Sequence, residues 1–299
     1  MSIHSRAGAY QSGPIADLGL DPFSLKFSST DGVSAVTDSR RIETLVDIHS
    51  HILPGLDDGA KSLDESVAMV QMAAEAGTTD IVATPHANDQ YAYDPETVHA
   101  KVAELQAACV GGIRIHWGCD FHMSYGNVQD ALQNPTKYTI DGGSYLLIEF
   151  SDMVIPPNTS AVLDQLLSVG IVPIVTHPER NPILQKKLSL LRDWVERDCL
   201  VQVTAGSFLG RFGRAAEKAT RELMARDLVH VVASDAHDLR HRTTALNRAY
   251  HHIEKHYSLQ HAQALLVRNP GAVVMGQSVD SQGLMGSERK APLWRRLLG

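Results

Sequence analysis

Histidine and aspartate side chains recur directly after short apolar runs at five places in the chain. The segments are DIHSH at 47–51, TPH at 84–86, GCD at 118–120, THPER at 176–180 and SDAH at 234–237. In proteins that alternate strands and helices, the C-terminal ends of the strands carry the functional side chains. These residue types bind metal ions, so the pattern predicts a multi-metal hydrolytic site built from His49, His51, His86, Asp120, His177, Asp235 and His237.

Two of these segments place ligand types two residues apart. His49 and His51 form one pair, and Asp235 and His237 form the other. In an extended chain such residues point to the same side, so each pair can hold one ion. A single pair could equally be incidental and face solvent, but the other strand ends make metal binding the better interpretation.

An acidic pair, Asp57 and Asp58, precedes Gly59 in the loop that follows the first histidines. Such residues are common in turns, because their side chains bond to nearby backbone. The alternative that we favour is that one carboxylate, Asp58 rather than Asp57, binds a further ion. Carboxylates beside imidazoles suit Mn²⁺, Fe or Zn²⁺, and they differ from the all-oxygen sites of Mg²⁺ and Ca²⁺.

Two arginines accompany the ligand segments, Arg180 in THPER and Arg242 shortly after His237. An isolated arginine is usually a surface residue. Beside metal ligands, however, the guanidinium fork suits a phosphate and the charge that grows on it during transfer. The chain lacks a cysteine followed six residues later by arginine, and it also lacks GxSxG, GxxxxGK[ST] and HExxH motifs. The residues therefore predict metal-dependent hydrolysis of a phosphoester.

The elements expected to position these side chains are alternating strands and helices. Ser62 and Glu65 form a capping box for a helix that ends at Gly77, and Asp94 with Pro95 begins another that reaches about Cys109. Apolar runs predict seven strands, at 45–48, 80–84, 113–117, 145–150, 170–175, 200–205 and 228–234. Further helical patterns occupy about 158–168, 182–197, 214–227, 243–257 and 259–267.

Several of the predicted strands are apolar on both faces, which is typical of a parallel α/β sheet. An open doubly wound sheet and a closed barrel give similar patterns. Ligands from five strand ends favour the barrel, because closure brings the ends of distant strands to one mouth. We expect one such domain at 44–276, a flexible leader at 1–43 and a disordered tail at 277–299.

Composition narrows the functional classes further. The 299 residues carry a formal net charge of −7, which disfavours nucleic acid as a partner. The three cysteines contain no CxxC and favour a reducing cytoplasm. No apolar stretch approaches the ~18 residues of a membrane span, so we do not expect the chain to span a membrane.

Long phrases of the chain resemble a known family. DIHSHILPGLDDGAKSLDES, YLLIEFS, THPERN and DLVHVVASDAHDL are similar to the polymerase-and-histidinol-phosphatase (PHP) superfamily, and within it to the CpsB-type tyrosine-protein phosphatases of bacterial capsule and exopolysaccharide systems. The likeness covers about 45–270. Phrases of this length are far more specific than an HxH pair alone.

The resemblance implies a distorted (β/α)₇ barrel with three divalent metal ions, often Mn²⁺, in its mouth. Arg180 and Arg242 would hold phosphate, while a metal-bridged hydroxide attacks the phosphorus of phosphotyrosine. Asp120 stands where the family usually has glutamate, so this side chain is one methylene shorter. The implied metal ligands are His49, His51, Asp58, His86, Asp120, His177, Asp235 and His237.

The natural substrate implied by the resemblance is the phosphotyrosine-containing tail of a polysaccharide-export tyrosine kinase. Three alternatives stay open from the sequence. The chain could be a PHP-type small-molecule phosphatase acting on a compound such as histidinol phosphate, or a nuclease-like PHP domain, which its acidity disfavours. It could also be a catalytically weak regulatory module that docks on a kinase.

Overall fold

The computed structural model describes residues 44–279, and every structural statement below concerns that part of the chain. The predicted leader, residues 1–43, and the predicted tail beyond residue 279 lie outside it. The first residues of the predicted tail, 277–279, are described and contact the barrel. The Tyr145 hydroxyl donates to the carbonyl of Gln277 at 2.7 Å and accepts from the N–H of Val279 at 3.1 Å.

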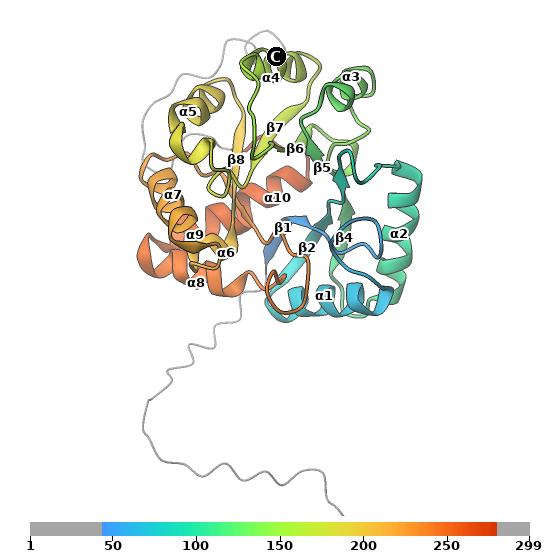
Figure 1. Ribbon diagram of the computed structural model, residues 1–299. Coiled ribbons are helices and arrows are strands. Elements are labelled where there is room, and N and C mark those ends of the chain that lie inside the picture. The colour runs from blue at the N-terminus through green and yellow to red at the C-terminus, as the bar shows by residue number, and fades with distance from the viewer. Residues whose placement is uncertain (1–43, 280–299) are drawn as a thin grey trace, which may run out of the picture. The chain divides into compact units, whose positions relative to one another are not determined.

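The described strands form two parallel sheets (Figure 1). The three-stranded sheet has the order β1 (Leu45–Ser50), β2 (Thr78–Ala83) and β4 (Arg114–Trp117). The six-stranded sheet has the order β3 (His86–Ala87), β5 (Asp120–His122), β6 (Tyr145–Glu149), β7 (Val172–Thr176), β8 (Leu200–Thr204) and β9 (Val231–Ala233).

Two short strands, β3 and β5, were not predicted; each follows a predicted strand after a brief interruption, which explains the larger number of strands. The run that forms β2 and β3 is interrupted at Thr84–Pro85, where proline has no N–H for a sheet hydrogen bond. The run that forms β4 and β5 is interrupted at Gly118, where a Cβ atom would lie 3.1 Å from Ile140 and 3.2 Å from Val82. The seven strand positions predicted from the apolar runs are therefore confirmed.

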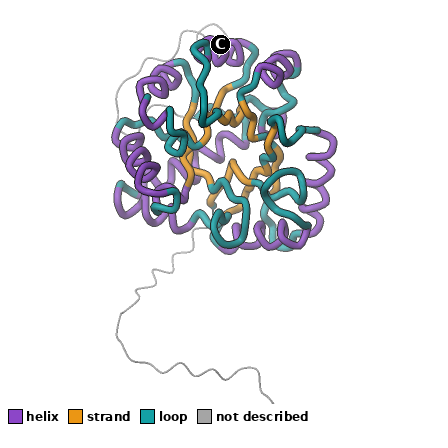
Figure 2. Tube along the Cα trace, in the orientation of Figure 1, coloured by secondary structure: helices purple, strands orange, loops and turns teal. Residues whose placement is uncertain are grey.

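Backbone contacts between β1 and the segment after β9 close the ring. Ser50 pairs with Ala236 in a parallel bridge, the Asp235 N–H donates to the His49 carbonyl at 2.8 Å, and the His51 N–H donates to the Ala236 carbonyl at 2.8 Å. Figure 2 shows the strands as an inner ring with the helices outside it. The predicted (β/α)₇ barrel, rather than an open sheet, is confirmed.

Most of the predicted helices are present, and their caps are as expected. The Ser62 hydroxyl accepts from the Glu65 N–H at 3.2 Å, and the Asp94 carboxylate accepts from the Thr97 N–H at 3.1 Å. Short helices at 125–133, 205–208 and 269–274 were not predicted. The α-helices are α1 (Leu63–Glu75), α2 (Pro95–Ala108), α3 (Tyr125–Gln133), α4 (Thr159–Ser168), α5 (Leu188–Glu196), α6 (Ala205–Phe208), α7 (Gly213–Ala225), α8 (Asn247–His256), α9 (Leu259–Gln263) and α10 (Asn269–Val274).

Three shorter or irregular turns complete the helical elements: η1 (Ile140–Gly142), η2 (Leu184–Lys186) and a π-helical turn, η3 (Ala264–Arg268). Within residues 44–279 no helix is both long and apolar enough to cross a membrane.

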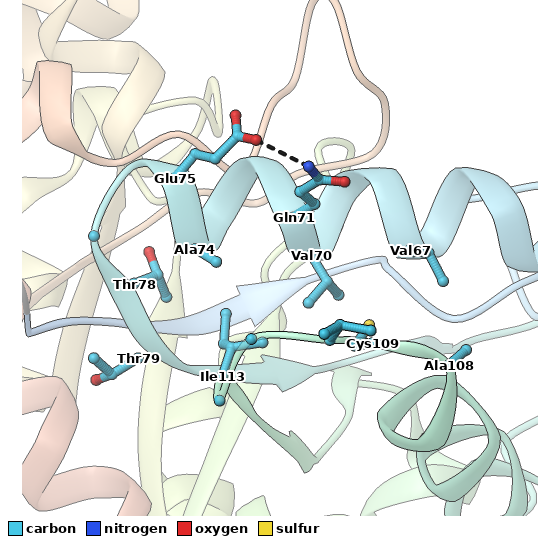
Figure 3. A pocket seen from close by; sticks show the side chains of 14 residues that line it. Val67, Val70, Gln71, Ala74, Glu75, Thr78, Thr79, Ala108, Cys109 and Ile113 are labelled. Atoms are coloured by element: carbon cyan, nitrogen blue, oxygen red, sulfur yellow. Dashed lines mark hydrogen bonds between the residues drawn. The ribbon is translucent and has the colours of Figure 1, made fainter.

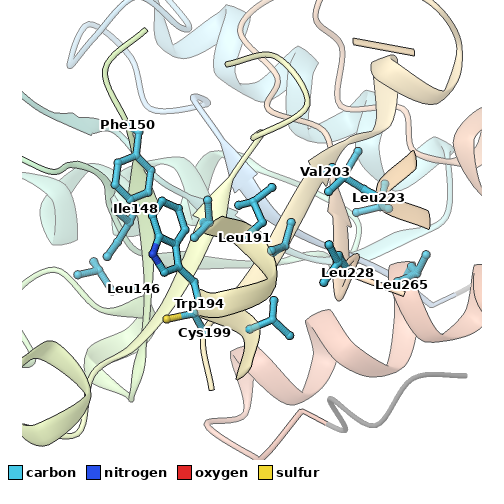
Figure 4. Packing of buried hydrophobic residues seen from close by; sticks show 14 of the residues in the cluster. Leu146, Ile148, Phe150, Leu191, Trp194, Cys199, Val203, Leu223, Leu228 and Leu265 are labelled. Carbon is cyan, nitrogen blue, oxygen red and sulfur yellow. The ribbon is translucent and has the colours of Figure 1, made fainter. Parts of the chain in front are cut away.

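The largest group of buried apolar side chains lies between the strands and the outer helices (Figure 4). At its centre the rings of Phe150 and Trp194 stack with centroids 5.1 Å apart and an interplanar angle of 16°. The Trp194 indole N–H donates to the Ser160 hydroxyl at 3.0 Å, so the buried polar atom is satisfied. This packing holds α5 against β6, whose last residues reach the mouth of the barrel.

A charged cluster joins β2, β4 and η1 away from that mouth. Arg114 donates twice to the Asp80 carboxylate, at 2.7 and 2.8 Å. The two ring nitrogens of His116 lie 2.5 Å from Asp141 and 3.0 Å from Asp80. Burial lowers the pKa of His116, but its bonds to Asp141 and Asp80 outweigh burial and raise the pKa above its usual value.

We expect His116→Gln to lower the free energy of unfolding by about 1 kcal/mol near pH 6, because it removes a charged pair of hydrogen bonds. A raised pKa stabilises the fold fully below the unfolded value of about 6.5, and this stabilisation is lost as the pH rises through the folded value. The loss should therefore shrink near pH ~9. Urea unfolding of parent and variant at both pH values measures it, and an equal loss at both would show that the imidazolium charge is not responsible.

Candidate active site

The predicted ligands come together at the C-terminal ends of the strands. His49 and His51 lie on either side of Ser50, the last residue of β1. His86 and Asp120 lie three residues beyond the C-terminal ends of β2 and β4, where they begin the short strands β3 and β5. Three sets of side chains each place one ligand atom per residue within 4.8 Å of the others. The sets are His51, Asp58, His86 and His237; His49, His51 and Asp120; and His86, Asp120 and Glu149.

The sets overlap, so they form one cluster rather than three separate sites. His51, His86 and Asp120 each belong to two sets. Asp120 does so although it is one methylene shorter than glutamate: one of its oxygens lies 3.5 Å from His49 Nε2 and 3.2 Å from His86 Nδ1. The shorter side chain still reaches both neighbouring groups.

Two predicted ligands lie outside these sets but border them. One oxygen of Asp235 lies 3.5 Å from the Nε2 atoms of both His49 and His51. His177 Nε2 lies 3.7 Å from Glu149. The structure thus brings all the predicted ligand residues to one place, and their roles as ligands remain predictions.

Buried polar atoms in this cluster have no hydrogen-bond partner among the described residues. They are His86 Nδ1, both carboxylate oxygens of Asp120, and His237 Nε2. Leaving such an atom unsatisfied costs about 1–3 kcal/mol. A divalent cation would coordinate these nitrogen and oxygen atoms together, so the residues present fit metal ions.

A second layer of side chains orients the first two histidines. His51 Nδ1 lies 2.7 Å from Asp57, and His49 Nδ1 lies 2.9 Å from Gln202 on β8. Their Nε2 atoms therefore face the cluster, 3.3 Å apart. Such partners fix the orientation and tautomer of a ligating histidine. Asp57 therefore orients His51, whereas Asp58 belongs to a ligand set. The sequence favoured Asp58 over Asp57 as the ligand.

Gly59 makes this loop possible. A Cβ atom at this position would lie 2.0 Å from the backbone oxygen of His51, so no other residue fits without moving the chain. The Gly59 N–H also donates to Asp57 at 2.9 Å, which fixes the carboxylate behind His51. The DDG motif is therefore a structural requirement for the orientation of His51.

The carboxylates of the cluster favour the binding of cations. Burial alone would raise the pKa of Asp235, but His49, His51 and two arginines hold it well below its usual value. Burial likewise opposes protonation of His86, yet Asp120 and Asp58 raise its pKa to about 11. The carboxylates therefore attract positive charge at this point, and a divalent ion would supply it.

His177 has the opposite character. Burial and the nearby Arg180 lower its pKa to about 3, so the imidazole is neutral and has a free lone pair at neutral pH. Its φ of 33° lies in the left-handed region, as does the φ of 51° at Asp235. For residues other than glycine this conformation is uncommon and carries an energetic cost, although Asp141, Asp198 and Asp227 adopt it outside the cluster as well.

The two predicted arginines converge on Asp235. Arg242 Nη2 lies 2.6 Å from one oxygen of this carboxylate, and Arg180 bonds to the same oxygen. Arg180 is also held by the ring of Phe212, 4.4 Å from the guanidinium carbon. The arrangement places two guanidinium groups beside the ligand cluster.

Glu149 is a site residue that the sequence analysis missed. It ends β6, and its carboxylate lies 3.8 Å from His86, 3.9 Å from His122 and 3.7 Å from His177. The sequence did contain a signal for it. Glu149 stands at the end of the apolar run of β6, just as the predicted ligands stand after other apolar runs. The sequence analysis also missed His122, which lies two residues after Asp120.

A cavity of about 500 Å³ adjoins the cluster. Its walls include Glu149, His177 and Arg180, so a substrate held there would meet both the ligand cluster and a guanidinium. The remaining lining residues are Asn88, Asp89, Gln90, His122, Phe150, Ser151, Asp152 and Asn181.

A second cavity, of about 640 Å³, lies between α1 and the loop that joins α2 to β4 (Figure 3). Its wall includes Gly77 and Thr78, at the start of β2, so it lies away from the strand ends that carry the ligands. Burial raises the pKa of the Cys109 thiol in its wall, which makes the thiol less nucleophilic. None of the predicted ligand residues lines this second cavity.

Comparisons with known proteins agree with this geometry. The family model described as "Capsular polysaccharide synthesis, CpsB/CapC" matches residues 45–275. The chain is 35% identical to the putative tyrosine-protein phosphatase CapC of Staphylococcus aureus, over 69% of this chain and 82% of that protein. It is 33% identical to the tyrosine-protein phosphatase YwqE of Bacillus subtilis, over 75% and 92%.

A solved structure extends the likeness to three dimensions. It comes from work on YwqE of Bacillus subtilis and CpsB of Streptococcus pneumoniae, described there as unique metal-dependent tyrosine phosphatases. The TM-score is 0.73 at 30% sequence identity, and the match covers 79% of this chain and 96% of the other.

Proposed function

Because this chain belongs to the CpsB/CapC family of capsular polysaccharide synthesis proteins, we propose that it is a metal-dependent tyrosine-protein phosphatase. It is then a phosphoric monoester hydrolase whose substrate is phosphotyrosine. The observation that carries the proposal is the convergence of three overlapping ligand sets beside two arginines at one end of the barrel.

We assign three divalent ions to the cluster, one for each ligand set, with Mn²⁺ as the first expectation and Fe or Zn²⁺ as alternatives. The mixture of imidazoles and carboxylates supports this choice of metals. The ligands would be the predicted set, His49, His51, Asp58, His86, Asp120, His177, Asp235 and His237, joined by Glu149. When bound, such ions lower the pKa of water and polarise phosphoryl oxygens.

The side chains of the chain have distinct tasks in this reaction. Arg180 and Arg242 bind the phosphate oxygens and offset the charge that grows on them. Asp57 and Gln202 keep His51 and His49 oriented. The tyrosyl leaving group has a pKa of about 10, so it needs only modest help from an acid as it departs.

The physiological substrate we propose is the phosphotyrosine-containing tail of a tyrosine kinase that controls polysaccharide export. Support comes from the capsular polysaccharide synthesis family and from its phosphatase members. The reaction would take place in the cytoplasm. Free thiols at Cys109, Cys119 and Cys199 are consistent with a reducing compartment.

A substrate panel tests the function. The metal-loaded protein should hydrolyse a phosphotyrosyl peptide at least about tenfold more efficiently than the matching phosphoseryl peptide or histidinol phosphate, judged by kcat/KM. A preference for histidinol phosphate would make the chain a small-molecule phosphatase. No turnover of any phosphoester, with metal bound, would favour the regulatory module instead.

A further inference from the structure

Exposed apolar side chains lie in two segments that follow strands next to the active-site cavity: the first residue of α3, and the loop after β6. Tyr125 is 83% exposed, Met153 is 87% exposed and Val154 is 57% exposed. Tyr125 follows β5, and Met153 and Val154 follow β6, which pairs with β5 in the sheet. Exposed apolar side chains that gather beside a site mark a candidate contact surface for a partner, whereas single scattered ones are ordinary.

The loop that carries Met153 and Val154 is anchored at both ends. The Asn181 amide donates to the backbone oxygen of Ser151 at 3.1 Å, and the side chain of Ile155 packs against the main core. The two prolines that follow Ile155 restrict the backbone further. The loop is therefore ordered, yet Met153 and Val154 between its anchors point into solvent.

The same contacts tie this loop to the catalytic machinery. Asn181 directly follows Arg180, and Ser151 and Asp152 line the active-site cavity. The segment before Tyr125 joins at the same point, because the Met123 N–H donates to the Glu149 backbone oxygen at 3.0 Å. Met153 and Val154 thus directly follow two lining residues of the cavity, and Tyr125 lies three residues after His122, another lining residue.

We propose that Tyr125, Met153 and Val154 form a docking surface for the polypeptide on either side of the phosphotyrosine. This proposal rests on the proposed function and adds to it a partner of defined chemistry. The occupant is an extended protein segment with apolar residues next to the phosphotyrosine. A small phosphoester fits inside the 500 Å³ cavity, whose lining includes none of these three residues.

Two carboxylates at the cavity restrict which residues can flank the phosphotyrosine. Asp89 and Asp152 both line the cavity, and neither forms a salt bridge with a described lysine or arginine. Carboxylates placed there repel acidic residues beside the phosphotyrosine. We therefore expect apolar or basic flanking residues to be accepted and acidic ones to be disfavoured.

The test compares two triple variants of the full chain. The first carries Tyr125→Ser, Met153→Ser and Val154→Ser. The matched control carries Val110→Ser, Leu259→Ser and Met275→Ser, which are also exposed apolar residues but lie in segments that contribute no lining residue to the active-site cavity. Each protein is assayed on p-nitrophenyl phosphate and on phosphotyrosyl peptides whose flanking residues are leucine, serine or glutamate.

We expect the first triple variant to lose about tenfold in kcat/KM on the leucine-flanked peptide, mainly through KM, and to keep the parent activity on p-nitrophenyl phosphate. Its preference for leucine over serine flanks should disappear. The control triple variant should match the parent on every substrate. The parent should hydrolyse the glutamate-flanked peptide least well.

Two results would overturn the docking surface. The first is unchanged peptide kinetics in the first variant; if this variant also lost binding to vesicles of anionic phospholipid, the side chains would be assigned to a membrane instead. The second is an equal loss on p-nitrophenyl phosphate, which would mean that these segments only support the site. If the parent itself hydrolysed no phosphotyrosyl peptide, the proposed function would fail as well, so the two failures can be told apart.

Discussion

Replacing both His49 and His51 by alanine is expected to reduce hydrolysis of p-nitrophenyl phosphate by at least about 10³-fold, because metal-ion catalysis supplies several kcal/mol of transition-state stabilisation. The two Nε2 atoms lie 3.3 Å apart and face the ligand cluster. His51 belongs to two of the three ligand sets and His49 to one of these, so the double variant damages both.

The fold should survive this change. The ring closes through the backbone atoms of His49 and His51, which alanine retains, and circular dichroism should match the parent. Metal analysis of the purified proteins should show less metal bound per chain than in the parent. A suitable control replaces His251 and His256, two exposed histidines on α8, by alanine. Retained turnover in the first variant would contradict the metal mechanism, and a loss in the control would point to a general effect of removing histidines.

The fold was largely predictable because several of its strands are apolar on both faces and its first two helices begin at strong caps. Ser62 and Asp94 are capping residues whose hydrogen bonds depend only on local sequence. The interruption at Gly118 was harder to predict. It depends on the closeness of Ile140 and Val82, which leave no room for a Cβ atom and which local patterns do not contain.

The ligand residues were predictable for a related reason: a parallel barrel turns a repeated position in sequence into a single place in space. His177 and Asp120 are far apart along the chain, but each follows or begins a strand at the same end of the ring. Glu149 satisfies the same rule and was overlooked because an acidic residue after an apolar run is also common on surfaces. Gln202 could not have been predicted, since its contact with His49 joins β8 to β1 across the cluster.

The arginines separate phosphate binding from metal binding, and their replacement should show this. We expect Arg180→Gln with Arg242→Gln to lower kcat/KM by about 10²- to 10³-fold, because both charges that offset the phosphate are lost. The metal content should stay at the parent level or rise. Both guanidinium groups bond to Asp235, and without them this carboxylate is freer to coordinate an ion.

Inhibition by inorganic phosphate provides a direct reading of the same contacts. It should weaken in the double arginine variant, whereas Arg221→Gln, which removes an exposed arginine paired with Glu217, should behave as the parent does. If the double variant lost its metal together with its activity, the arginines would be supports of the metal site instead. The arginine bonds to Asp235 are made by the side chains, whereas the His237 N–H donates to the Arg242 backbone oxygen at 2.8 Å and this bond survives the substitution. We therefore expect the metal to remain and the phosphate contacts to be lost.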